Sequence, residues 1–403
     1  MAPRLRSAVV RFDALPEPAL RVIMLALPVD ARARAACVCR SWRAFLSDPS
    51  LWQVLDLTPA GGVDEERVTE NLVRGAVARA ARQMRVLSSS NSWHAFDELL
   101  VAVIASDGAE LRQVNTTNVM LYVRQLDAVF AAAPRLQVLN ARVGGSCTEL
   151  LPCLRNDPPY GPLRVSHLNV WRGPDFTAVA DALAFAAAVA SHESVKGLSL
   201  MHMELAQGVN ALVDAAAKRR VAQLSLQNCS LNAETIPALA RLLQRGTLTK
   251  LEVICLGFPD ADQENLLKLC DALRACHTLT HLELILRPPN DATRQTITEL
   301  LDAAAALPAL FELNLSNSWA LDRVAFGRAL GALLLANLPS LRALLVYGCF
   351  LGDEGLGALL DGLAVNTHLR TLQCTGNNPS EAFARDRLEP ALAALAARAE
   401  LDT

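Results

Sequence analysis

The stretch Val221-Ala-Gln-Leu224-Ser-Leu226-Gln-Asn-Cys229-Ser-Leu231 decides the fold. Its first apolar residues follow the order apolar-x-x-apolar-x-apolar, and the same order recurs along the chain. The repeats average about 29 residues and begin at Leu111, Leu136, Val165, Val195, Val221, Leu248, Leu279, Leu310, Leu341 and Leu369, with weaker copies at Trp52 and Met84. A period of this length predicts repeated units that share one continuous core.

Helical stretches are predicted between these strands, because apolar residues recur there at three- and four-residue spacing. Examples are residues 233–243, 264–275, 294–306 and 356–364. Within one unit, Leu224 and Leu226 point inward from a short strand, and the apolar face of the following helix closes the wedge behind them. A single wedge cannot bury its faces alone, so the units stack with their strands in a parallel sheet.

This alternation of strand and helix resembles the ribonuclease-inhibitor type of leucine-rich repeat over roughly residues 52–395. The resemblance implies a curved α/β solenoid with a parallel sheet on its concave face. The ninth position of such a repeat usually holds Asn or Cys, whose side chain satisfies backbone groups where the chain turns. Cys229, Cys349 and Asn377 occupy that position here, and units without such a residue, as in 248–256, are expected to turn irregularly.

Residues 12–52 interrupt the repeat with a different set of motifs. In order, these are Leu15-Pro16, then Ile23 and Leu27, then Val38-Cys39-Arg40-Ser-Trp42-Arg43, and finally Asp48-Pro-Ser-Leu51-Trp52. Together they resemble an F-box over about 40 residues. The sequence departs from that family where Pro18 and Ala19 replace the usual Glu-Leu and Met24 replaces an aromatic residue.

The resemblance implies a small helical module that docks on the Skp-type adaptor of SCF-type cullin–RING ubiquitin ligases. About 40 residues are too few to enclose an independent core, so exposed apolar side chains gain most by packing against a partner helix. The residues expected to bind the adaptor are Leu15, Pro16, Leu20, Ile23, Met24 and Leu27. The loss of a leucine at Ala19 is expected to weaken that binding.

The alternative is that this segment only caps the first repeat. For Val38, Trp42 and Leu51, packing inside the chain is favoured over contact with a partner. Because residues 51–57 both close the F-box pattern and open the first repeat, a rigid junction is expected. The predicted organisation is an F-box at 10–55, a capping region with irregular first repeats at 56–110, and a leucine-rich-repeat domain at 111–395.

A cargo surface is predicted on the concave side of the sheet, away from the helices, since alternate residues of a strand face opposite sides. Two features define it: exposed apolar or aromatic side chains, and an acidic row formed by three glutamates. The candidate residues are Trp171, Met201, Glu252, Ile254, Glu283, Ile285, Glu312, Leu345 and Tyr347. Like charges on neighbouring strands cost stability unless a cation relieves them, which points to a basic cargo. The alternative is that these are ordinary solvated strand positions.

Composition excludes several classes of function. A net charge of −3 gives no bulk attraction to nucleic acid or membrane. The first residues do not read as a signal peptide, and ten cysteines then indicate reduced thiols in the cytoplasm or nucleus. Neither Cys37 with Cys39 nor Cys270 with Cys276 and His277 matches zinc spacing, so no metal, cofactor or catalytic residue is predicted.

The sequence therefore predicts a non-catalytic substrate-recognition subunit of an SCF-type ubiquitin ligase. In this interpretation the F-box binds the adaptor and the repeats bind cargo for degradation. One alternative is a non-catalytic scaffold or inhibitor whose F-box-like segment caps the solenoid. Another is a ligase that carries ubiquitin on a cysteine of its own.

Overall fold

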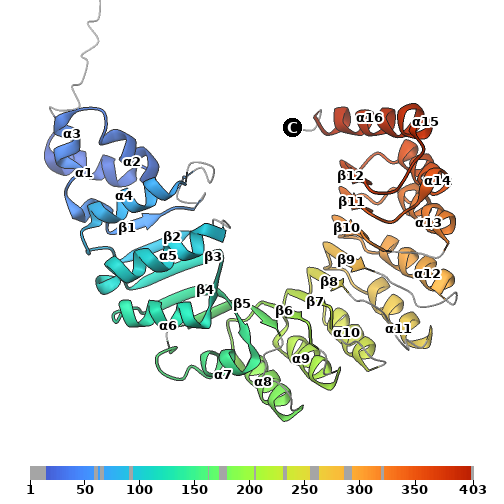
Figure 1. The fold of residues 1–403 in the computed structure, drawn as a ribbon, viewed down its shortest axis with the longest axis horizontal. Coiled ribbons are helices and arrows are strands. Elements are labelled where there is room, and N and C mark those ends of the chain that lie inside the picture. The colour runs from blue at the N-terminus through green and yellow to red at the C-terminus, as the bar shows by residue number, and fades with distance from the viewer. Residues whose placement is uncertain are drawn as a thin grey trace, which may run out of the picture. The chain divides into compact units, whose positions relative to one another are not determined.

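The computed structural model describes residues 15–58, 62–63, 68–89, 94–161, 163–171, 179–203, 206–229, 234–254, 263–285, 293–318 and 322–400 (Figure 1). The chain divides into two compact units. The first consists of Met1–Gly144 with Asn156–Ser166, and the second of Gly145–Arg155 with His167–Thr403.

The first unit opens with a helical segment. Its elements are α1 (Glu17–Ala26), α2 (Val29–Ala35), α3 (Arg40–Phe45) and the short 3-10 helix η2 (Pro49–Trp52). Pro18 lies in the first turn of α1, where its missing N–H has no intrahelical partner to lose. The core of the segment consists of side chains with no exposed surface: Met24, Leu46, Leu51 and Trp52.

Strand–helix units follow within the first unit. They comprise β1 (Val54–Asp56), α4 (Glu70–Ala80), β2 (Val86–Ser89), α5 (His94–Asp107), the 3-10 helix η5 (Gly108–Glu110), β3 (Gln113–Tyr122), α6 (Val123–Ala132) and β4 (Val138–Ser146). The strands pair in parallel, and the buried residues Leu55, Leu87, Val114 and Leu139 are register partners. One apolar row per strand thus builds the core between sheet and helices.

The second unit repeats this alternation, and the boundary between the units divides two strands: β4 ends in the second unit and β5 begins in the first. Its elements are α7 (Cys147–Arg155), β5 (Leu163–Trp171), α8 (Val179–Ser191), β6 (Gly197–Met201), α9 (Ala206–Arg219), β7 (Gln223–Gln227), α10 (Thr235–Gln244), β8 (Lys250–Ile254), α11 (Gln263–Arg274), β9 (His281–Ile285), α12 (Thr293–Ala305), β10 (Glu312–Asn314), α13 (Arg323–Leu335), β11 (Ala343–Leu345), α14 (Gly352–Val365) and β12 (Thr371–Gln373). A C-terminal stretch follows, with α15 (Glu381–Phe383), a π-helical turn (Ala384–Leu388) and α16 (Glu389–Glu400).

The predicted fold class is confirmed. A helical N-terminal segment precedes parallel strands that alternate with helices, and α8–α14 lie on one side of the strands of the second unit (Figure 1). Nearly every predicted repeat start stands two residues before a strand, as Leu248 does before β8. The exception, β5, begins before Val165, but its pairing with β6 starts at His167, again two residues on. One apolar residue of each repeat therefore fixes one strand.

Two helices of the second unit pack unusually closely. A Cβ atom on Gly331 of α13 would lie 2.3 Å from the carbonyl oxygen of Ala358 on α14, and one on Gly362 would lie 2.3 Å from the carbonyl oxygen of Gly331. Gly327 makes the same kind of approach to Gly355. Only glycine leaves room for backbone at this distance.

The ninth-position residues contact backbone carbonyls, as predicted, and these carbonyls belong to the preceding repeat. Asn377 donates from Nδ2 to the Val346 carbonyl at 2.7 Å, while the Sγ atoms of Cys229 and Cys349 lie 3.4 and 3.2 Å from the carbonyls of Leu200 and Leu315. Ser318 makes the equivalent bond to the Leu284 carbonyl at 3.2 Å, which the sequence prediction missed. The turn expected to be irregular, from residue 255 on, lies outside the described residues.

Candidate functional site

Helix α1 is apolar on two opposite faces. Met24 has no exposed surface and turns toward the core of the helical segment. On the other side, Val22 is 69% exposed and Leu25 is 50% exposed. With 3.6 residues per turn, Pro18 falls on the same side as these two residues, and it is exposed as well. The outward face of α1, defined here as Pro18, Ala19, Val22, Leu25 and Ala26, carries no charged side chain.

The predicted adaptor residues lie on other sides of α1 or just beyond its ends, at Leu15, Pro16 and Leu27. Pro16 is exposed, and the predicted residues that are partly exposed are Leu15, Leu20, Ile23 and Leu27. The prediction for Met24 is wrong, because its side chain is fully enclosed by the chain itself. The sequence prediction also missed Val22 and Leu25. Periodicity shows that a helix is apolar on two sides, and only tertiary packing decides which side is buried.

The turn between α2 and α3 adds another exposed apolar side chain. Val38 is 66% exposed, so the expectation that it packs inside the chain is wrong. Its neighbours Cys37 and Cys39 are exposed cysteines. Leu51 is fully buried, as expected, while Trp42 is partly exposed.

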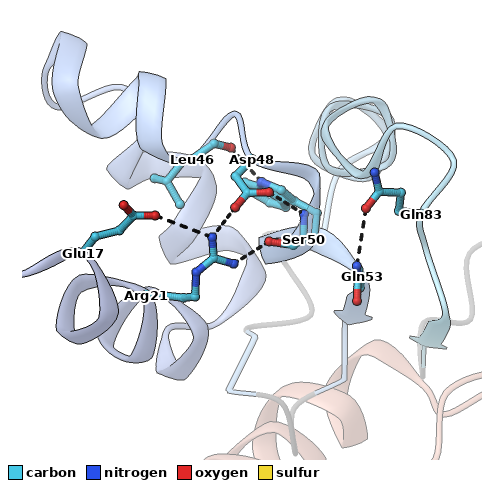
Figure 2. Close-up of polar contacts among 8 residues, drawn as sticks. Glu17, Arg21, Leu46, Asp48, Ser50, Gln53 and Gln83 are labelled. Carbon is cyan, nitrogen blue, oxygen red and sulfur yellow. Dashed lines mark hydrogen bonds and ion pairs between the residues drawn. The ribbon is translucent and has the colours of Figure 1, made fainter.

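A polar network fastens α1 to the turn that closes the helical segment (Figure 2). Arg21 donates from Nη1 to Ser50 Oγ at 2.5 Å and forms an ion pair with Asp48, and its guanidinium also lies 4.0 Å from the Glu17 carboxylate. Asp48 accepts the Ser50 N–H at 3.0 Å. Hydrogen bonds from Ser50, and then the contact with Arg21, lower the pKa of Asp48.

A buried cation joins the helical segment to the first strand. Arg32 is 6% exposed and donates to the carbonyls of Leu27, Leu51 and Val54. Its guanidinium carbon stands 5.5 Å from the centre of the Trp52 ring. Because these partners are neutral carbonyls and an aromatic ring, burial lowers the pKa of Arg32.

The same tryptophan also contacts the first repeat helix. The guanidinium carbon of Arg79 on α4 stands 5.4 Å from the Trp52 ring centre. Trp52 itself donates from Nε1 to the Leu46 carbonyl at 2.7 Å. Gln53 and Gln83 add a side-chain hydrogen bond of 3.4 Å between the end of this segment and the residues after α4 (Figure 2). The helical segment and the first repeat therefore share one set of contacts.

Most of the predicted cargo residues lie together on the strands of the second unit. They occupy the side that faces away from the helices, called the outward side below. Glu252 and Glu283 are register partners in the middle of β8 and β9, and Ile254 and Ile285 are partners at the ends of those strands. Trp171 and Met201 are partners at the ends of β5 and β6. All six side chains are partly exposed.

The remaining three candidates have different neighbours. Leu345 is partly exposed and pairs in register with Asn314, and Tyr347, just beyond β11, is 46% exposed. The predicted acidic row is wrong for Glu312, because its register partners are His281 and Ala343 rather than Glu283. The row contains two glutamates, and the third stands two residues nearer the start of its strand.

The electrostatics of the acidic pair are asymmetric. Lys250 Nζ lies 2.6 Å from Glu252 Oε1, so that carboxylate has a cation beside it. For Glu283, burial and then the charge of Glu252 raise the pKa, while Lys250 and a hydrogen bond from Asn314 act in the opposite direction. Of the two glutamates, Glu252 therefore has an ion pair with Lys250, while Glu283 is the one whose pKa is raised.

The described residues offer little for covalent or metal chemistry. They contain no group of three His, Cys, Asp or Glu side chains placed to hold a metal ion. Burial raises the pKa of the Cys147 thiol to about 12 and those of Cys270 and Cys349 to about 11, which disfavours the nucleophilic thiolate. Across the part of the chain that the structure describes, no helix is both long and apolar enough for a membrane span.

Comparison with known proteins bears on the N-terminal segment. A comparison with curated proteins found no match. Among solved structures, a complex of Rad7 and Elc1 from yeast is similar at 16% sequence identity and a TM-score of 0.40, and the match covers 88% of this chain and 80% of that chain. Residues 12–58 match the F-box-like family model. The chain thus carries an F-box-like domain, followed by strand–helix units of the leucine-rich-repeat kind.

Proposed function

We propose that this chain is a substrate-recognition subunit of an SCF-type cullin–RING ubiquitin ligase. Its F-box-like domain binds a Skp-type adaptor, and the outward side of its strands binds a cargo protein. The chemistry of ubiquitin transfer belongs to other subunits of the complex. The observation that carries this proposal is the uncharged outward face of α1, which lies within the residues that match the F-box-like model.

The exposed side chains have the size and polarity of interface anchors. Burying a Val or Leu side chain completely contributes roughly 1.5–3 kcal/mol, and Val22 and Leu25 together with Val38 present this potential on neighbouring elements. A helix from a partner that covers them would remove apolar surface from water at no cost in buried charge. The nearby Arg21 is already paired with Asp48, so the rim of this surface is polar and fixed.

The rigid junction supports the same function. Arg32 and Arg79 hold Trp52 from two elements, so the domain is fixed to the first repeat. A ligase subunit gains from this rigidity, because cargo must be presented at a defined distance. We further propose residence in the cytoplasm or nucleus, supported by thiols that form no disulfide at Cys37, Cys147, Cys229, Cys270, Cys276, Cys349 and Cys374. Imaging of a tagged chain tests that location, and a secreted pool would contradict it.

The same junction favours a second candidate function. A domain built into the first repeat also suits a cap, in which case the chain is a non-catalytic scaffold or inhibitor. The two candidates differ in one property, since only the first requires capture of an adaptor. The sequence departs from the F-box pattern at Pro18 and Ala19. Adaptor capture that is undetectable in the wild-type chain and rises greatly when a Glu-Leu pair is restored there would favour the scaffold, whereas capture that the wild-type chain already shows favours the ligase subunit.

A pull-down with a purified Skp-type adaptor tests the proposal. The wild-type chain is compared with Val22→Lys/Leu25→Lys, which places charge on the outward face of α1. The matched control is Leu335→Lys/Val365→Lys, because these residues are 59% and 55% exposed at the ends of α13 and α14. We expect capture by wild type and control only. Capture by all three chains would exclude this contact face, and capture by none would favour the scaffold. A Leu15→Ala/Pro16→Ala/Ile23→Ala chain tests the sequence-based contact set in the same assay.

A further inference from the structure

The outward side of β8–β10 combines two features that select one class of partner. The first is the pair Glu252–Glu283, whose Cα atoms are separated by the strand spacing of about 4.8 Å. The second is the pair Ile254–Ile285, which stands two residues farther along the same strands. At roughly 3.3 Å per residue, about 7 Å separates the acidic pair from the apolar pair.

The charges on this surface do not balance. The charged and titratable side chains that face outward on these strands are Lys250, Glu252, His281, Glu283 and Glu312. With histidine neutral, three carboxylates face one ammonium group, while the described outward positions of the neighbouring β7 and β11 carry no charge: Gln223, Ser225, Gln227, Ala343 and Leu345. Lys250 already pairs with Glu252 at 2.6 Å, so among the described residues Glu283 has no ion pair of its own.

We infer that this surface binds an extended segment of the cargo in which a Lys or Arg side chain meets Glu283 and an apolar side chain covers Ile254 and Ile285. This inference rests on the proposed function and adds the chemistry of the cargo. Side chains two residues apart in an extended segment lie about 7 Å apart on one face, which matches the distance between the two pairs. A basic group beside Glu283 also relieves the repulsion from Glu252.

The inference differs from a general attraction of basic molecules. The whole chain carries a net charge of only −3, so selectivity must come from these local carboxylates. The spacing requirement is equally specific, because a segment with its basic and apolar residues side by side sends them to opposite faces. Charge and spacing are therefore separate, measurable properties of the bound segment.

The test measures fluorescence anisotropy of labelled peptides with the full chain. The first probe repeats the unit Leu-Ser-Lys-Ser, with leucine and lysine two residues apart; the second replaces every lysine by glutamate, and the third places leucine and lysine next to each other. We expect the first probe to bind at least about tenfold more tightly than the other two. Equal affinity for the lysine and glutamate probes, or no binding of any probe, would overturn the inference.

Variants assign the binding to the named residues. Glu283→Gln should weaken binding of the lysine probe about fivefold to tenfold, and Lys250→Gln should strengthen it, because each changes the local charge in a known direction. Glu193→Gln is the matched control, since its side chain is exposed on the loop after α8. Unchanged affinity in Glu283→Gln would contradict the inference. So would self-association of the chain that depends on Glu283, or binding of Ca²⁺ alone at this pair.

Adaptor capture is measured on the same preparations, so that the two proposals fail separately. If the chain captures the adaptor but binds none of the peptides, the proposed function stands and this inference is wrong. A chain that binds the lysine probe through Glu283 without capturing an adaptor is a scaffold for basic segments.

Discussion

Glu252 on β8 and Glu283 on β9 are register partners, so two carboxylates stand side by side on the outward side of the strands. Burial and the neighbouring charge raise the pKa of Glu283 above its ordinary value of 4.5. A pKa that is higher in the folded than in the unfolded chain stabilises the fold at low pH, and that contribution is lost as pH rises through the folded value.

We therefore predict that Glu283→Gln becomes more stable relative to wild type as pH rises from about 4.5 to neutral. Urea unfolding at several pH values measures this difference in the free energy of unfolding. The advantage should shrink at high salt, because part of the repulsion acts across solvent. Glu193→Gln should show no such trend. A constant difference across the pH range would show that Glu283 is not under electrostatic strain.

The buried cation Arg32 should contribute strongly to the stability of the helical segment and its junction with the first repeat. Arg32→Ala leaves the carbonyls of Leu27, Leu51 and Val54 without this donor, and we expect a loss of about 2–4 kcal/mol. Arg79→Ala removes a contact with Trp52 and a hydrogen bond to the Gly75 carbonyl, both partly exposed, and should cost about 0.5–1 kcal/mol. Arg40→Ala, at an exposed position, should change stability by less than about 0.5 kcal/mol. If thermal unfolding shows equal effects of all three variants, Arg32 does not stabilise the junction as proposed.

Gly331→Ala should destabilise the second unit although alanine is the better helix former. The new Cβ would meet the Ala358 carbonyl oxygen at 2.3 Å, so α13 and α14 must move apart. We expect a loss of about 2–3 kcal/mol from this overpacking, against a gain of up to about 1 kcal/mol from helix propensity. Gly161→Ala is the control, because a Cβ atom added at Gly161 would meet no heavy atom within 4 Å. Chemical denaturation that shows Gly331→Ala to be neutral or stabilising would contradict the close packing.

Asn377 should be the most sensitive of the ninth-position residues. Its side chain is fully buried, donates to the carbonyls of Val346 and Cys374 at 2.7 and 2.8 Å, and accepts the Leu351 N–H at 3.2 Å. We expect Asn377→Ala to cost about 2–4 kcal/mol, since three buried backbone groups lose their partner. Cys349→Ala removes only a weak thiol donor and should cost less, about 1–2 kcal/mol. The reverse order in unfolding experiments would refute the ranking.

The repeat architecture was predictable because one physical constraint recurs. Each strand must bury apolar residues at fixed spacing. Positions such as Leu248 and Leu341 therefore predict where β8 and β11 begin. The position of Glu312 was predictable too, because it stands two residues after Leu310, as His281 does after Leu279. Glu252 and Glu283 stand four residues after the start of their repeats, so the same spacing separates Glu312 from them.

The adaptor face was harder to predict for a physical reason. Met24 and Val22 are both apolar and two residues apart, so they face opposite sides of one helix. Which side is buried depends on Leu46, Leu51 and Trp52, which approach α1 only after the chain has folded back. The buried role of Arg32 is likewise invisible in sequence, because its partners are backbone carbonyls.

Amide hydrogen exchange of the wild-type chain, with and without a Skp-type adaptor, tests the proposed docking face most directly. We predict that the adaptor slows exchange in α1 and in the turn around Val38, and leaves β5–β12 unchanged. The same measurement on Val22→Lys/Leu25→Lys should show no protection at either place. Protection confined to the strands, or an adaptor that binds without protecting α1, would contradict docking through the outward face of this helix.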